Sequence, residues 1–173
     1  AKDVSEFDTL EEYKADLRKK LVEKAEHQAE HENEDNVVEK VVENAEVEIP
    51  EVMVEKRIDN LAYDFDMRLR YQGLELQKYV EMMGMQMSDF RDQLRERARK
   101  EVKTQLVIEK VGQTEAIAAA DADVEEEIAK LAGNYRQEPD EFKKQLKEDD
   151  IQYIKETLIA RKTVEFLVEN ARL

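Results

Sequence analysis

The chain has 173 residues, of which 41% are hydrophobic and 41% charged, with four Gly, two Pro and no Trp or Cys. Its net charge of −15 argues against nucleic-acid binding, because neutralising phosphates requires clustered Lys and Arg. The lack of Cys excludes disulfides, thiolate catalysis and thiolate metal sites. Few helix breakers and many charges are typical of long helices that bury one apolar stripe. We therefore expect an elongated all-α molecule with several small apolar seams.

No stretch of the sequence approaches the apolar length of a membrane span, and the start does not resemble a signal peptide. We therefore expect no membrane partner. The chain begins at Ala1 without an initiator Met, which is consistent with a piece of a longer protein.

The first predicted helix is long and covers about residues 1–45. Residues 8–11 (Asp-Thr-Leu-Glu) place an acidic residue three positions after a possible N-cap, which is typical of a helix start. Leu10, Leu17 and Leu21 then repeat at helical spacing, whereas residues 23–36 contain no large apolar residue. The sequence therefore predicts a helix that is anchored at both ends and solvated in between.

Residues 46–50 alternate in polarity and end in Pro50, which predicts a short extended connector with the proline starting the next helix. The region 51–116 is the predicted first arm. It is expected to contain a helix from 51 to about Gly73, a short helix from about 74 to 83 that ends at Gly84, and a long helix opened by residues 88–91. Glycine is favoured just after a helix because it accepts the left-handed conformation.

The region 117–173 is the predicted second arm and return helix. Asp121 or Asp123 is expected to cap a helix that ends at Gly133, and Pro139 to begin a short helix before a last helix that runs to the terminus. Consecutive helices joined by short turns pack as antiparallel hairpins. The expected architecture is therefore a single domain, 1–173, whose long helices form a body with two projecting helical-hairpin arms.

All six methionines lie between Met53 and Met87, four of them in the run 82–87. Methionine is flexible and polarizable, and clusters of it recur on binding faces that accept many partners. The neighbouring Tyr79 and Phe90 add to an apolar surplus that exceeds what a thin hairpin can bury. Methionine at helical spacing also fills core seams, so a binding surface and a packed seam both remain open.

Two further patterns have simple alternatives. His27, Glu30 and His31 match H-x-x-E-H, in which two imidazoles on one helix face can share a zinc ion. No third ligand stands out, and the motif lies in the most solvated part of its helix, so a zinc hydrolase is the minor hypothesis. The basic stretch Arg91–Lys103 is interrupted by acidic residues, and we interpret it as a solvated helix face.

No G-x-S-x-G, P-loop or G-x-G-x-x-G motif is present. Carboxylate pairs are expected by chance in a chain with 43 acidic residues, and they carry no acid–base signal without a pocket. We therefore expect neither an enzyme nor a bound cofactor or metal.

The segment 47–59, VEIPEVMVEKRID, closely resembles the trigger-factor family of bacterial ribosome-associated chaperones, which has the pattern V-x-I/V-P-x-x-L/M-V/I-x-x-x-I/L-D at this point. Residues 7–18, 97–111 and 163–170 are also similar to that family, so the resemblance covers essentially the whole chain. It is limited to the C-terminal helical chaperone domain. The family's ribosome-docking loop and its aromatic-lined isomerase pocket have no counterpart here, so the ribosome-binding and peptidyl-prolyl isomerase domains are absent.

The resemblance implies an ATP-independent chaperone domain of the bacterial cytoplasm that binds unfolded or nascent polypeptides through apolar patches in a helical cradle. It implies ribosome contact only through a missing N-terminal domain, and exposed apolar arms also suit a weak homodimer. The alternative is a structural helical scaffold or dimerisation module that binds no client. The candidate client-binding residues are Met53, Phe65, Leu69, Tyr79, Met82, Met83, Met85, Met87, Phe90, Ile154 and Leu158.

Overall fold

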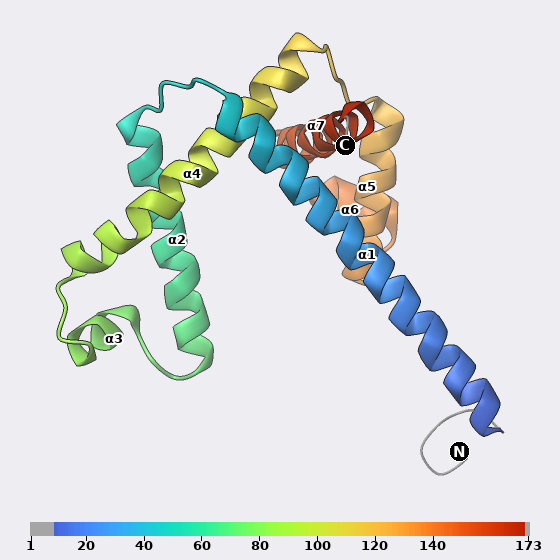
Figure 1. Cartoon of the computed structure of the whole chain (residues 1–173), viewed down its shortest axis with the longest axis horizontal. Helices are drawn as coiled ribbons and strands as arrows, with labels where there is room; N and C mark the ends of the chain where they lie inside the picture. Colours follow the sequence, from blue (N-terminus) through green and yellow to red (C-terminus); the bar gives the residue numbers. More distant parts are fainter. Residues whose placement is uncertain (1–8, 172–173) are drawn as a thin grey trace.

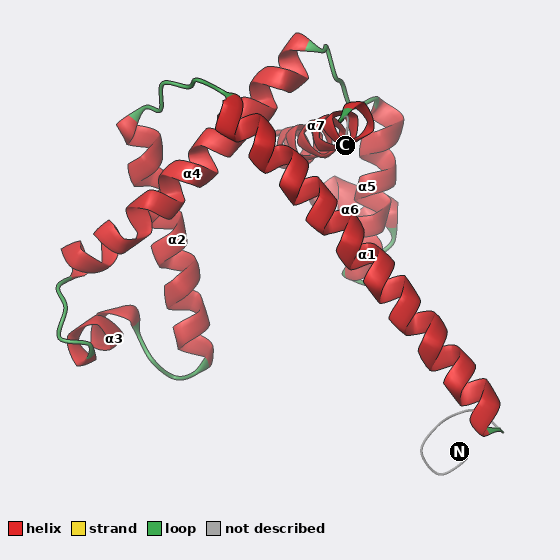
Figure 2. Ribbon diagram, in the orientation of Figure 1, coloured by secondary structure: helices red, strands yellow, loops and turns green. Residues whose placement is uncertain are grey.

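The structure is a computed structural model that describes residues 9–171, and every regular element in this range is a helix (Figures 1 and 2). The helices are α1 (Leu10–Asn44), α2 (Glu51–Tyr71), α3 (Leu76–Met82), α4 (Met87–Thr114), α5 (Asp121–Asn134), α6 (Pro139–Gln145) and α7 (Glu148–Asn170). Helices α2 and α4, with α3 between them, project to one side, and α5 to α7 form a second group (Figure 1). The predicted elongated all-α fold with two arms is confirmed.

Helix α1 begins with a capping box. Thr9 Oγ1 accepts a hydrogen bond from the Glu12 N–H at 3.2 Å, and Glu12 Oε2 accepts one from the Thr9 N–H at 3.1 Å. The N-cap is therefore Thr9, one residue after the predicted Asp8, which lies outside the described residues. Residues 21–32 are exposed, and only Val37 and Val42 are buried, where α1 packs on α4 and α7.

The other helix starts are set by short local signals. Pro50 is the N-cap of α2, and Pro139 is the first residue of α6. Asp123 accepts a hydrogen bond from the Ala120 N–H at 2.8 Å, so this residue, and not Asp121, supplies the cap of α5. Helix α4 begins earlier than predicted, because Asp89 accepts a hydrogen bond from the backbone of Gln86 at 3.0 Å.

Two helix ends agree with the sequence and one does not. Gly73 and Gly84 follow α2 and α3 with φ of +76° and +68°, as glycine's access to the left-handed region allows. Ala116 and Arg136 hold the same position after α4 and α5, with φ of 53° and 55°. The prediction that α5 ends at Gly133 is wrong, because Gly133 is helical and the left-handed residue is three positions later.

The apolar core is divided between the two arms, as expected from the composition. The first arm buries Val54, Ile58 and Leu61 of α2 against Ala98 of α4. The second arm has its own cluster, which consists of Ala119, Val124, Ile128, Ile154 and Leu158. Helix α7 connects the parts because it packs on α1, α4 and α5. Each arm therefore has an apolar cluster of its own.

Candidate functional site

An aromatic cluster joins the three helices at the tip of the first arm. The ring centroid of Phe65 on α2 lies 5.3 Å from that of Tyr79 on α3 and 5.3 Å from that of Phe90 on α4. Such tilted and edge-on contacts add about 0.5–1.5 kcal/mol per pair beyond the area they bury. The cluster holds the short helix α3 against the end of the α2–α4 hairpin.

A carboxylate attaches the start of α3 to the same hairpin. Asp66 Oδ1 accepts a hydrogen bond from the Leu76 N–H at 2.9 Å, while Asp66 Oδ2 accepts one from Arg70 Nε at 2.7 Å. These two hydrogen bonds, first that from the Leu76 N–H and then that from Arg70, hold the pKa of Asp66 below its ordinary value. The carboxylate therefore stays ionised at neutral pH and fixes the tip.

The methionine run divides into an exposed and a packed half. Met82 and Met83, at the end of α3, are 77% and 58% exposed. Met85 and Met87, beyond Gly84, are half-buried, and Met85 Sδ accepts a hydrogen bond from Gln93 Nε2 at 3.3 Å. The run is therefore exposed at Met82 and Met83 and packed at Met85 and Met87, and client binding by the exposed pair stays a prediction.

The remaining candidates lie deeper. Met53, Phe65 and Tyr79 are half-buried on the first arm. The buried candidates are Leu69, Phe90, Ile154 and Leu158. Ile154 and Leu158 belong to the core of the second arm, so the structure does not bring them together with the methionines.

Four exposed apolar residues on α2 are absent from the sequence-predicted set: Val52, Tyr63, Met67 and Tyr71. Tyr63, Met67 and Tyr71 are 64%, 36% and 87% exposed, and their spacing of four places them on one helix face. That face is the one α2 does not pack on α4. The signal was present in the sequence as a second apolar stripe beside the buried one.

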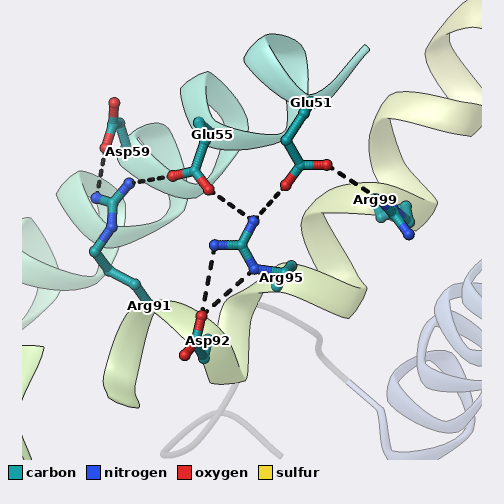
Figure 3. A network of polar contacts seen from close by, with 7 residues as sticks. All are labelled: Glu51, Glu55, Asp59, Arg91, Asp92, Arg95 and Arg99. Carbon is teal, nitrogen blue, oxygen red and sulfur yellow. Dashed lines mark hydrogen bonds and ion pairs between the residues drawn. The ribbon is translucent and has the colours of Figure 1, made fainter. Parts of the chain in front are cut away.

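A ladder of ion pairs fixes α2 against α4 (Figure 3). Acidic residues four apart on α2 face basic residues four apart on α4, and the pairs run in opposite directions along the two helices. The pairs are Glu51 with Arg95 and Arg99, Glu55 with Arg91 and Arg95, and Asp59 with Arg91. The predicted solvated basic face is therefore wrong for these three arginines, which bind the neighbouring helix.

The ladder perturbs the groups within it. Hydrogen bonds from Arg91 and Arg95 lower the pKa of Glu55, and hydrogen bonds to Asp59 and Glu55 raise the pKa of Arg91. Exposed ion pairs each contribute little to stability. The ladder's main effect is therefore to specify the antiparallel register of the hairpin.

The two histidines lie on the exposed part of α1. Their ring centroids are 5.9 Å apart, and His31 Nδ1 lies 3.1 Å from a carboxylate oxygen of Glu34. Among residues 9–171 no group of three or more His, Cys, Asp or Glu side chains is placed to hold a metal ion. The zinc hypothesis thus has two ligands and no third. No described helix is both long and apolar enough to cross a membrane.

Comparison with known proteins places the chain in a family. The family model for the C-terminus of bacterial trigger factor protein matches residues 9–169. The trigger factors of Ruminiclostridium cellulolyticum and Acetivibrio thermocellus are 59% and 56% identical over 173 residues, which is 100% of this chain and 40% of each relative. The chain thus spans 40% of the length of these relatives.

Solved structures show the same arrangement of helices. A structure of trigger factor domains from Thermotoga maritima matches with a TM-score of 0.60 at 24% sequence identity. The match covers 82% of this chain and 83% of the Thermotoga chain. A second structure, from work on promiscuous substrate recognition by the trigger factor chaperone, has a TM-score of 0.59 at 26% identity and covers 98% of this chain and 41% of that one. With the family match and the close bacterial relatives, these findings show that the chain belongs to the trigger factor family and corresponds to its C-terminal domain.

Proposed function

We propose that this domain is an ATP-independent chaperone that binds unfolded or nascent polypeptides through apolar patches in the cradle formed by its arms. The observation that carries the proposal is the exposure of Met82 and Met83 on a tip that the aromatic cluster holds rigid. A flexible thioether adapts to many apolar surfaces, and a rigid support avoids an ordering cost on binding. Such a surface suits clients of many sequences.

The surroundings of this surface support the same function. Tyr63, Met67 and Tyr71 extend exposed apolar area along α2. The net charge of −15 keeps a protein with such patches soluble, because copies of it repel one another. Several weak contacts release a client when it folds and buries its own apolar residues, so the cycle needs no nucleotide.

The test is whether the domain delays aggregation of a chemically denatured client without ATP, at several-fold molar excess. The double variant Met82→Ser/Met83→Ser should lose most of this effect while its circular dichroism and Tm stay unchanged, because both side chains are already in solvent. Leu10→Ser/Leu21→Ser removes two exposed apolar side chains from α1, which are 58% and 65% exposed, and is the matched control. Wild-type protein that leaves aggregation unchanged contradicts the proposal.

The second candidate function is a structural scaffold or dimerisation module. It is favoured by exposed apolar residues on the part of α1 that makes no described core: Leu10, Leu17, Leu21 and Val22. Sedimentation of the wild type and of Leu10→Ser/Leu21→Ser across a concentration series separates the two functions. A dimer that this variant abolishes, with no effect of the domain on aggregation, supports the scaffold.

Three further properties complete the proposal. The domain acts in the bacterial cytoplasm and has no catalytic activity of its own. Contact with the ribosome is made only by an N-terminal domain that is not part of this chain. The weak homodimer proposed from its exposed arms is tested by the same sedimentation series. Metal analysis of the purified protein tests the zinc alternative, which requires about one bound ion per chain on His27 and His31.

A further inference from the structure

A groove of about 700 Å³ lies between α4 and α7, where the base of the first arm meets the second. Its apolar lining comes from Ile108 on α4, Ile117 after α4, and Ile159 and Ala160 on α7. This volume is within the range of sites that hold small ligands or a few side chains. The groove is separate from the exposed methionines on the arm tip.

The carboxylates at the groove are not equivalent. Glu101 binds Arg57 at 2.5 Å and Arg97 at 2.7 Å, so its charge is matched within the protein. Glu109 on α4 and Glu156 on α7 have no such partner in residues 9–171. They accept hydrogen bonds only from neutral amides of their own helices.

Those amides are Gln113 Nε2, at 3.2 Å from Glu109, and Gln152 Nε2, at 2.8 Å from Glu156. By contrast, Glu127 on α5 is bound by Arg161 of α7 at 3.1 Å, and Asp123 on α5 is bound by Lys162 of α7. The groove thus combines an apolar floor with two negative charges, one from each wall, that the protein does not neutralise.

We propose that this groove is a client subsite for an extended segment that carries Lys or Arg next to an aliphatic residue. This inference rests on the proposed chaperone function and specifies which client segments the domain prefers. The aliphatic side chain and the methylene stem of the cation cover the isoleucines, while the charged head reaches Glu109 and Glu156. An acidic segment is repelled by the same two carboxylates.

The charge also argues against a second copy as the occupant. Each copy carries a net charge of −15, so the approach of one chain to an acidic groove of another is unfavourable at low ionic strength. An unfolded segment with local positive charge is attracted by the same field. The charge of the groove therefore selects a basic client segment.

The probes are three labelled ten-residue peptides of Ser and Gly around a central Leu-X-Leu, with X as arginine, citrulline or glutamate. Citrulline has nearly the shape of arginine without its charge. We expect the arginine peptide to bind roughly 3- to 10-fold more tightly than the citrulline peptide, the ratio expected for two exposed charge pairs. The glutamate peptide should bind most weakly, and the preference should shrink at high salt.

The variant Glu109→Gln/Glu156→Gln keeps the shape of the groove and should abolish the preference for arginine over citrulline. Glu96→Gln/Glu169→Gln, on the same two helices, changes the net charge equally and lies outside the groove lining, so it should keep the preference. A second variant, Ala160→Phe, should weaken binding of the arginine and citrulline peptides alike by filling the floor. Methyl NMR shifts should then locate the arginine peptide at Ile108 and Ile159.

The outcomes separate the subsite from the general function. If both double variants reduce the arginine preference equally, or if the methyl shifts lie on the arm tip, the groove is not the subsite even if the domain still delays aggregation. If the wild type neither binds the peptides nor delays aggregation, the chaperone proposal itself is wrong. Loss of the preference only in Glu109→Gln/Glu156→Gln, with aggregation still delayed, supports the subsite.

Discussion

Gly112 of α4 lies directly against Thr163 of α7, so close that a Cβ atom at position 112 would be 2.8 Å from Thr163 Oγ1. Thr163 is fully buried, and its hydroxyl donates a hydrogen bond to the carbonyl of Ile159 on its own helix at 2.7 Å. The absence of a side chain at position 112 thus sets how closely the base of the first arm approaches α7.

Gly112→Ala should therefore destabilise the domain, although alanine is the better helix former. The overlap with Thr163 costs about 1–3 kcal/mol when a packed contact must move, against a gain of about 1 kcal/mol in helix propensity. We expect a lower denaturation midpoint in urea. Gly112→Ala/Thr163→Ala removes the overlapping atom and should recover the loss, whereas equal instability of the single and double variants contradicts this explanation.

Ala116→Gly and Arg136→Gly should each stabilise the domain. Both residues have left-handed backbones at helix ends, with φ of 53° and 55°, and glycine adopts this conformation without the clash of a Cβ atom. We expect a gain of about 0.5–1 kcal/mol for each, measured by chemical denaturation. Gln137→Gly is the control, because glycine at a position without a left-handed backbone should only loosen the chain, and a gain there would contradict the argument.

Phe90→Ala should open the first arm and leave the second intact. Phe90 is buried beneath Phe65, and removing a buried phenylalanine costs about 3–5 kcal/mol. Since the apolar clusters of the two arms are separate, amide hydrogen exchange should speed up across α2 to α4 and remain slow across α5 to α7. Leu158→Ala should have the opposite pattern. Faster exchange in both arms of either variant would mean that the arms unfold as one unit.

Acid should weaken the contact between α5 and α7. A hydrogen bond from Arg161 lowers the pKa of Glu127, and a hydrogen bond from Lys162 lowers that of Asp123. A carboxylate whose pKa is lower in the folded state stabilises the fold at every pH above its unfolded-state pKa, which is about 4.3 for Glu. This stabilisation is lost as the pH falls through the folded-state pKa. The difference in Tm between the wild type and Glu127→Gln should therefore be largest near pH 7 and vanish towards pH 3. A difference that persists at pH 3 would contradict this assignment.

Local chemistry made the helices predictable. Pro50, Gly73 and Gly84 mark element boundaries because their backbone preferences hold in almost any surroundings. The prediction failed at the end of α5, where the residue type does not mark the boundary. The left-handed residue after α5 is Arg136, because the hydrogen bonds from Arg136 N–H to Gly133 and from Gln137 N–H to Ala132 close the helix there.

The candidate site was only partly visible in the sequence. A helical stripe shows that Phe90 and Met82 are apolar, but not which of them a neighbouring helix covers. Phe90 is buried with the ring of Phe65 from α2 packed against it, whereas Met82, at the end of α3, is exposed. The groove between α4 and α7 has no sequence signature, since its walls come from residues about fifty positions apart.

The sequence by itself determined the helical class, the division into small seams and the family, because composition, helix-end residues and the segment around Pro50 are local properties. Only the tertiary structure decided which charges are neutralised. Water could solvate the charges of Arg95 and Glu55 equally well. They bind each other because the packed hairpin brings them to 2.6 Å. Glu109 and Glu156 have the same chemistry, yet within residues 9–171 their side chains accept hydrogen bonds from Gln113 and Gln152 and form no ion pair with Lys or Arg.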